Sequence, residues 1–422
     1  MAIGSNANNY YYLPNRMKEQ YQSPFNITVL VAGMGFFIDV FDLFLFNVYR
    51  IPSLRELGLE GQELTRKGEF LLSIQMAGMM LGGILTGIIG DKKGRVKALY
   101  ASIVLYSIAN IANSFVTDIN TYALVRFLAG VGLAGEMGSG ITLVAESMTV
   151  EKRGYGTIMV ATMGALGAIA AGLSADWLPW RTAFFVAGLA GFLLLRLRIA
   201  SMESSIFHSA LQSENAKGSL LLLISSKKRL TKYLACILVG IPIWYSVGLL
   251  ITLSPEIAAL KNISGLKLSV CFILFQAGVA AGDLSSGIIS QWLKTRKWTI
   301  FGFMLFGIAA TIYHFYRIES SGSLELSSLL IGLGCGYLSV FVTSTAEHFG
   351  TNLRVTVTAT VTNFMRGAVT ILIPLHIWIE NTWNLDLTKG LMIIGIMVWL
   401  LALAAILYLP ETYGKQLSFE ES

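Results

Sequence analysis

Two carboxylates lie within an apolar segment that is long enough to cross a membrane. The stretch "GFFIDVFDLF" places Asp39 and Asp42 inside the run 24–48. An aspartate at the centre of a membrane-spanning helix costs about 2.5 to 3.5 kcal/mol on insertion scales, so it faces a partner, a water-filled cavity or a mobile proton. Their i, i+3 spacing puts both on one helix face. The pair therefore predicts ion-pair or proton-binding chemistry inside a bilayer.

The composition of the chain indicates which surroundings these acids have. Hydrophobic residues make up 54% of the 422 residues and charged residues only 13%, with 42 glycines. This is far more apolar surface than a soluble core of this size needs. The formal net charge of +6 is typical of basic residues that fix membrane topology, so we expect a multi-pass membrane protein that binds the lipid bilayer and no nucleic acid.

Cysteine and histidine residues show no spacing typical of a metal site or a nucleophilic triad. The cysteines lie in apolar runs and the histidines are scattered: Cys236, Cys271, Cys335, His208, His314, His348 and His376. We therefore expect no metal, no cofactor and no enzymatic activity.

Windows of about 20 apolar residues predict twelve membrane spans. They cover 25–48, 69–90, 97–116, 120–147, 156–175, 182–198, 232–254, 266–291, 298–316, 323–344, 355–377 and 388–409. If both termini are cytoplasmic, 20 Lys and Arg lie on the cytoplasmic side, 9 lie outside and two lie within spans. The positive-inside rule supports this orientation.

A polar segment and an internal repeat divide the spans into two halves. We predict a cytoplasmic tail (1–24), a six-helix bundle (25–198), a cytoplasmic linker (199–231), a second six-helix bundle (232–409) and a cytoplasmic tail (410–422). "GIIGDKKGRVK" and "GIISQWLKTRK" lie 200 residues apart, and "AESMTVEKRG" and "AEHFGTNLRV" lie 201 apart. One shared offset indicates duplicated halves, an architecture that recurs among secondary transporters.

The first of these motifs resembles the loop between helices 2 and 3 of the major facilitator superfamily. "RFLAGVGLAGE", "AESMTVEKRG", "DWLPWRTAFF" and the terminal "PETYGKQL" are similar to stretches of its sugar porter, phosphate symporter and organic ion branches. The resemblance covers the whole chain. It implies an all-α membrane protein with twelve transmembrane helices in two pseudo-symmetric six-helix bundles, working as a monomer.

The resemblance also implies a gating role for loop residues of both halves that match the family motif. A glycine permits close helix approach, and carboxylate–arginine bonds at the loops can exist in one conformational state only. The candidate gating residues are Gly87, Asp91, Gly94, Arg95, Glu146, Arg153, Glu347 and Arg354. The second copy carries Gln291 and Lys294 in place of the acid and the second glycine, and the alternative role for the loop bases is to fix topology alone.

Four residues of the first half are candidates for proton coupling. In sugar porters an acid of helix 1 pairs with an arginine of helix 4, and Asp42 and Arg126 are the matching positions. Asp39 lies one turn away, and Glu136 matches a position where phosphate symporters carry an acid. The alternative is a static buried ion pair that only stabilises the bundle.

Arg366 is the base expected within the membrane in the second half. Its Arg-x(7)-Pro pattern resembles helix 11 of organic ion transporters, where an arginine is associated with anionic substrates, and a guanidinium can hold a carboxylate or phosphate through two hydrogen bonds. An internal ion pair with Asp283 is the alternative. Weaker candidates for the substrate site are Asp283, Asn363, Trp244 and Tyr245.

These features favour an alternating-access transporter that imports a small anionic or polar metabolite with protons. Phosphate, a carboxylate, an amino acid and a siderophore-like chelate all suit the residues. The alternatives are a proton-driven exporter, disfavoured by the lack of a Gly-Pro step in "GALGAIAAG", and an uncoupled facilitator. Short loops predict a bacterial inner-membrane protein with both termini cytoplasmic.

Overall fold

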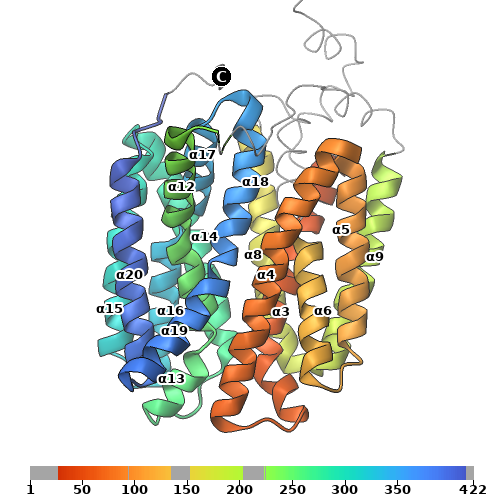
Figure 1. Cartoon of the computed structure of the whole chain (residues 1–422), viewed down its shortest axis with the longest axis vertical. Coiled ribbons are helices and arrows are strands. Elements are labelled where there is room, and N and C mark those ends of the chain that lie inside the picture. The colour runs from red at the N-terminus through yellow and green to blue at the C-terminus, as the bar shows by residue number, and fades with distance from the viewer. Residues whose placement is uncertain (1–26, 94, 135–152, 203–222, 224, 415–422) are drawn as a thin grey trace, which may run out of the picture.

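A computed structural model describes residues 27–93, 95–134, 153–202, 223 and 225–414. Every regular element within these ranges is a helix, and most run along the long axis of the molecule (Figure 1). The all-α membrane fold predicted from the sequence is confirmed.

The first half consists of six helices within the described ranges. They are α3 (Ile27–Glu56), α4 (Gly61–Lys93), α5 (Arg95–Asn113), α6 (Ile119–Leu133), α8 (Arg153–Trp177) and α9 (Trp180–Met202). Helix α3 packs on α8 and α9, α4 on α6, and α5 on α6 and α9. The predicted span 120–147 continues beyond the part of the chain that the structure describes.

The second half shows interrupted helices where continuous spans were predicted. Its elements are α12 (Lys227–Tyr245), the π-helix η1 (Ser246–Ile251), α13 (Ser254–Leu260), α14 (Leu268–Trp292), α15 (Lys297–Tyr316), α16 (Ser321–Cys335), α17 (Leu338–Glu347), α18 (Thr351–Gly367), α19 (Val369–Trp383) and α20 (Leu387–Tyr408). The break in the predicted span 323–344 falls at Gly336 and Tyr337, and the break in the span 355–377 falls at Ala368, directly after Gly367. Glycine is a poor helix former because it has the most backbone freedom to lose.

Helix length and hydropathy support membrane insertion. Among the described residues nine helices are long and apolar enough to cross a bilayer, and two shorter apolar helices cover Leu99–Asn113 and Ile119–Leu133. These positions are consistent with the twelve predicted spans.

Close glycine contacts repeat between the two halves. A Cβ added to Gly78 on α4 would lie 2.2 Å from the carbonyl oxygen of Phe127 on α6, and a Cβ added to Gly278 on α14 would lie 2.2 Å from that of Leu329 on α16. Only glycine permits these helix backbones to approach so closely. The corresponding glycines are 200 residues apart, the offset found in the sequence repeat.

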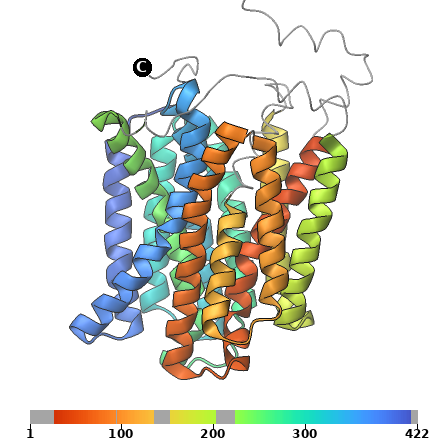
Figure 2. The same cartoon turned by 45° about the vertical axis from the view of Figure 1, so that its right-hand side comes forward.

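The two halves meet along α4, α8 and α14. Helix α4 packs against α18 and α19, and α8 packs against α14, as the turned view shows for α4 and α18 (Figure 2). We call the end of the molecule where α12 begins the upper face, and the end that carries α13 and the turn between α3 and α4 the lower face (Figure 1).

Candidate functional site

The two aspartates of α3 interact with arginines from different halves. Both carboxylates are fully buried. Asp42 interacts electrostatically with Arg126 on α6 of the same half, and Asp39 interacts with Arg366 on α18 of the other half. One face of one helix therefore presents a negative charge to each half, and the sequence had not predicted the pairing of Asp39 with Arg366.

Arg126 is held mainly by neutral groups. Its Nη2 donates to Asn110 Oδ1 at 2.8 Å and its Nε donates to Asn113 Oδ1 at 3.2 Å. The guanidinium carbon lies 4.6 Å from the ring centroid of Phe184, a distance typical of a cation–π contact. These contacts fix the arginine independently of its acidic partner.

Asp42 is bound less tightly than Arg126. The Asn110 amide lies near its carboxylate, but no donor among the described residues meets full hydrogen-bond geometry with either oxygen. A buried carboxylate without well-formed hydrogen bonds is an unstable anion that protonation can neutralise. The geometry is therefore suited to reversible proton binding.

Arg366 forms an aromatic and acidic site between the halves. Its guanidinium carbon lies 5.1 Å from the ring centroid of Trp244 on α12, and the Asp39 carboxylate on α3 interacts with it electrostatically. Both Arg366 and Trp244 are buried. Arg366 and Trp244, both predicted from the sequence as substrate residues, are thus in contact. Together with Asp39 they form a group that can bind an anion that carries a ring.

Three other predicted substrate residues have structural partners in this conformation. Tyr245 donates its hydroxyl to the Leu391 carbonyl at 2.7 Å, which fastens α12 to α20. Asn363 Nδ2 donates to the Ala134 carbonyl at 3.2 Å, which connects α18 to the end of α6. The remaining residue, Asp283, accepts the Ser339 backbone N–H at 2.9 Å and so caps the start of α17.

The predicted gating residues are described only in part. Glu347 Oε1 lies 3.5 Å from Arg296 Nη2, a partner that the sequence motifs had not singled out. The elements that contain five others are known, but their side chains are not described: Gly87 and Asp91 in α4, Arg95 in α5, Arg153 in α8 and Arg354 in α18. Gly94 and Glu146 lie outside the described residues, as does the proton-coupling candidate Glu136, so the first-half latch stays a prediction.

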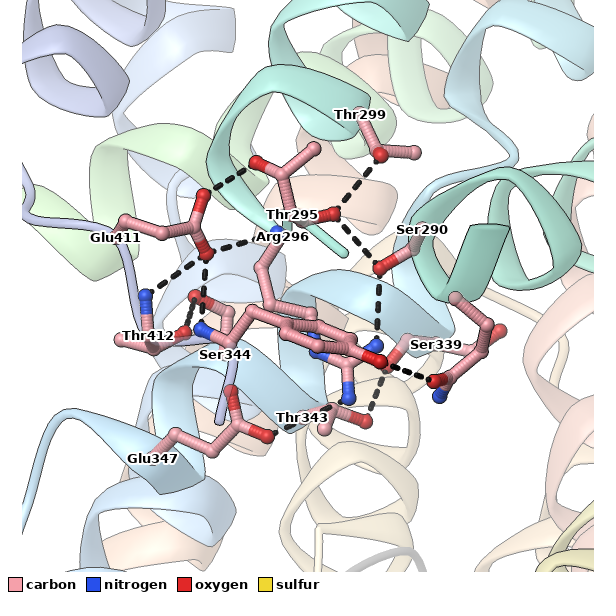
Figure 3. A network of polar contacts seen from close by, with 12 residues as sticks. Ser290, Thr295, Arg296, Thr299, Ser339, Thr343, Ser344, Glu347, Glu411 and Thr412 are labelled. Atoms are coloured by element: carbon pink, nitrogen blue, oxygen red, sulfur yellow. Dashed lines mark hydrogen bonds and ion pairs between the residues drawn. The ribbon is translucent and has the colours of Figure 1, made fainter. Parts of the chain in front are cut away.

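Glu411 of the terminal "PETYG" motif organises the upper face of the second half (Figure 3). It accepts the Thr295 hydroxyl and the backbone N–H groups of Arg296 and Lys297 at 2.8 and 3.2 Å. Partial burial opposes the charged form, but the donors of Thr295 and the nearby backbone outweigh it and lower the pKa of Glu411 to about 2. This carboxylate is a fixed anion that ties the chain after α20 to the start of α15.

Arg296 extends this upper-face network towards α14 and α17. Its Nη1 donates to Ser290 Oγ at 2.9 Å, its Nη2 pairs with Glu347, and its guanidinium lies 5.1 Å from the Tyr413 ring centroid. Four segments of the second half are thereby joined at one arginine (Figure 3).

Ion pairs join the two halves at the lower face. Arg50 Nη2 on α3 lies 2.6 Å from Glu256 Oε1 on α13 and 2.9 Å from the Thr252 carbonyl oxygen. Arg66 on α4 pairs with Glu380 on α19. Sequence reasoning missed these residues because no shared motif marks them; their one signal is a charge near the end of an apolar span.

Comparison with known proteins adds a family description. The sequence model described as Major Facilitator Superfamily matches residues 28–374. A "Probable 4-methylmuconolactone transporter" of Cupriavidus pinatubonensis is 24% identical over 391 residues, covering 90% of this chain and 89% of that protein. The 3-(3-hydroxy-phenyl)propionate transporter of Escherichia coli is 23% identical over 292 residues, covering 68% of this chain and 71% of that protein.

A solved structure has the same fold. The proton:xylose symporter XylE bound to 6-bromo-6-deoxy-D-glucose matches with a TM-score of 0.66 and 16% sequence identity, covering 93% of this chain and 97% of that one.

Proposed function

The chain belongs to the Major Facilitator Superfamily, and from this we propose that it imports a small ring-bearing organic carboxylate together with protons. It is a membrane transport protein of this family and not an enzyme. The observation that carries the proposal is the buried group of Asp39, Arg366 and Trp244 between the two halves.

Arg366 and Trp244 supply the two kinds of contact that such a substrate needs. A guanidinium binds a carboxylate through two parallel hydrogen bonds, and an indole ring packs against an aromatic or lactone ring. The relatives named for 4-methylmuconolactone and 3-(3-hydroxy-phenyl)propionate transport support a ring-bearing acid over phosphate or a sugar.

Asp39 acts as the internal counter-ion of Arg366 when substrate is absent. A buried guanidinium without a negative partner is costly, because the charge has lost its hydration. An incoming carboxylate competes with Asp39 for this arginine. The charge of the second half is thereby balanced both before and after substrate binding.

Asp42 is the group that exchanges the proton. The contacts of Arg126 with Asn110, Asn113 and Phe184 do not depend on a bond to Asp42, so we expect them to persist when Asp42 is neutral. Protonation of Asp42 therefore removes one charge without releasing the arginine. A proton that enters from one side and leaves on the other couples substrate movement to the proton gradient.

Alternating access requires that one face opens while the other closes. We assign the upper face to the cytoplasm, as the positive-inside rule predicts, and the lower face to the outside of a bacterial inner membrane. The Arg50–Glu256 and Arg66–Glu380 pairs join the halves at the lower face. These bonds suit a conformation closed to the outside, in a protein that works as a monomer in the bilayer.

Uptake into proteoliposomes tests the proposal. The panel contains benzoate, nicotinate and 3-phenylpropionate, with nicotinamide as an uncharged control. An inward proton gradient should drive at least one acid above its equilibrium level inside the liposomes, while nicotinamide should not accumulate above its equilibrium level. The proposal is wrong if no carboxylate is concentrated, or if only an outward proton gradient drives its movement.

A matched pair of variants tests the assigned arginine. Arg366→Lys keeps the charge but loses the planar pair of donors, so uptake of the active acid should fall while some transport remains. Arg317→Lys changes an arginine beyond the end of α15 and should leave uptake unchanged. Equal uptake by both variants would contradict the role of Arg366.

A further inference from the structure

Four ionisable side chains from both halves form a buried cluster at the lower face. Arg66 and Glu69 come from α4, and His376 and Glu380 come from α19. His376 has 0% exposure, Glu69 2% and Glu380 6%, whereas the Arg66 side chain keeps 26%. We call these four residues the lower cluster.

The histidine lies between two carboxylates that belong to different halves. His376 Nε2 is 2.8 Å from Glu380 Oε1, and His376 Nδ1 is 3.6 Å from Glu69 Oε1. Arg66 pairs with Glu380 and also lies 3.4 Å from Glu69 Oε2. Each half therefore contributes one carboxylate and one base.

When both carboxylates are ionised, the charges of the lower cluster balance only if the histidine is protonated. With a neutral imidazole, Arg66 alone opposes the two carboxylates and the cluster has a net charge of about −1, taking each carboxylate as ionised. An imidazolium brings the cluster to neutrality and places a positive charge between both acids. In a buried site the electrostatic energies of these two charge states differ strongly, because little water is present to screen the charges.

The charged groups of α3 and of the start of α20 that lie near the cluster have close partners of their own among the described residues. Arg50 on α3 acts on Glu69, but its own close partner is Glu256 of α13. Helix α20 approaches through Gly390, where a Cβ would lie 2.9 Å from Glu380 Cγ and 3.1 Å from His376 Cδ2. The charged residues nearest in sequence on that helix, Asp386 and Lys389, pair with each other at 3.1 Å.

Separation of the halves would divide the cluster. Helix α4 would carry Arg66 and Glu69 away from α19, and His376 would keep only Glu380, one turn along its own helix. The joined cluster therefore binds a proton more tightly than the divided one. By linkage, the conformation that binds the proton more tightly becomes more populated as the pH falls.

We propose that the lower cluster is a proton-binding site that closes the lower face when His376 takes up a proton. Histidine is the side chain that most often acts as a proton switch at the pH values that cells meet. The inference rests on the alternating access of the proposed function. It adds a site, 334 residues from Asp42 in sequence, at which outside protons promote closure behind the substrate.

Accessibility of a cysteine at position 73 measures closure without any substrate. Ser73 is 8% exposed and its backbone carbonyl accepts from Thr370 Oγ1 of the other half at 3.1 Å. The three native cysteines are replaced by alanine, and a membrane-impermeant maleimide is applied to Ser73→Cys. A cysteine at the exposed position Thr117, in the turn between α5 and α6, reports the side of the membrane and corrects for the faster reaction of all thiols at high pH.

The expected result is protection at low pH. The ratio of labelling at position 73 to labelling at position 117 should fall about fivefold or more between about pH 8 and about pH 5.5. His376→Asn should abolish this dependence. A wild-type ratio that does not change with pH would overturn the proposal.

His314 provides the matched control. It is equally buried, and its Nδ1 lies 2.9 Å from Ser327 Oγ with no acidic group in ion-pair contact among the described residues. His314→Asn should keep the full pH dependence. The proposal fails if the two variants behave alike.

A second variant, and an assay that does not depend on transport, keep the outcome interpretable. If His376→Asn does not reach the membrane, Glu69→Gln removes one of the two carboxylates and should reduce the pH dependence; an unchanged dependence would overturn the site. The labelling assay involves no transport. A protein that closes with falling pH but concentrates no carboxylate would refute the proposed function and leave the lower cluster intact.

Discussion

Removing the negative partner of Arg50 should open the lower face. In the closed conformation the Arg50 side chain is fully buried and pairs with Glu256 at 2.6 Å, its only other hydrogen bond in the described residues being to the Thr252 carbonyl. Glu256→Gln keeps the shape of the side chain but removes the close countercharge of the guanidinium. The cost falls on the closed conformation, because separation of the halves would return Arg50 to water.

The size of the effect follows from the burial of the pair. A hydrogen bond to a charged group contributes about 1.5 to 3 kcal/mol, and the remaining bond to Thr252 favours the lower value. About 1.5 kcal/mol corresponds to roughly a tenfold shift towards the open conformation. Maleimide labelling at position 73 should rise by this factor at constant pH.

A glutamate exposed at the same face supplies the control for this prediction. Glu63 lies in the first turn of α4 and is exposed, so Glu63→Gln should leave labelling unchanged. If Glu256→Gln labels like Glu63→Gln, the Arg50–Glu256 pair does not hold the lower face closed.

Three further changes separate substrate affinity, helix packing and upper-face stability. Asp39→Asn removes the internal competitor of Arg366, so the affinity for the substrate anion should rise severalfold in a binding titration; unchanged affinity would contradict the pairing. Gly278→Ala would place a Cβ 2.2 Å from the Leu329 carbonyl oxygen and should cost about 1 to 3 kcal/mol, seen as a lower melting temperature. Gly287→Ala, with nothing within 4 Å of the new Cβ, should not lower it. Glu411→Gln should cost about 1 kcal/mol at neutral pH, after allowance for solvent screening. Since folding lowers the Glu411 pKa from 4.5 to about 2, its contribution is complete above pH 4.5 and is lost as the pH falls through about 2. A deficit that persists at low pH would contradict that reasoning.

The spans and the duplicated architecture were predictable because they depend on local patterns. Hydropathy windows respond to the bilayer thickness, which is the same for every span. The repeat offset of 200 residues was visible in loop motifs and reappears in the contacts of Gly78 and Gly278. The breaks at Gly336 and directly after Gly367 were missed because a window average does not register a single glycine between apolar neighbours.

The candidate site was predictable only where a residue pattern had a counterpart in a known family. The resemblance pointed to Asp42 with Arg126, and the structure brings these two groups within electrostatic reach. It gave no partner for Asp39, because Arg366 lies on a distant span of the other half. Sequence spacing carries no information on which spans become neighbours between bundles.

The lower cluster illustrates the same limit more strongly. Arg66 and Glu380 are 314 residues apart, and His376 belongs to no motif in the sequence. Scattered histidines were interpreted as having no joint role, since clustering was sought along the chain. The clustering exists only in space, through the packing of α4 on α19.

Coupling through Asp42 is the central claim, and counterflow measured beside proton-driven uptake tests it most directly. Asp42→Asn removes the titrating group and keeps its shape, while Arg126 keeps its bonds to Asn110 and Asn113. In the same liposomes, exchange of labelled for unlabelled carboxylate should continue and concentration driven by a proton gradient alone should be lost. Substrate that Asp42→Asn still concentrates under that gradient would contradict the account.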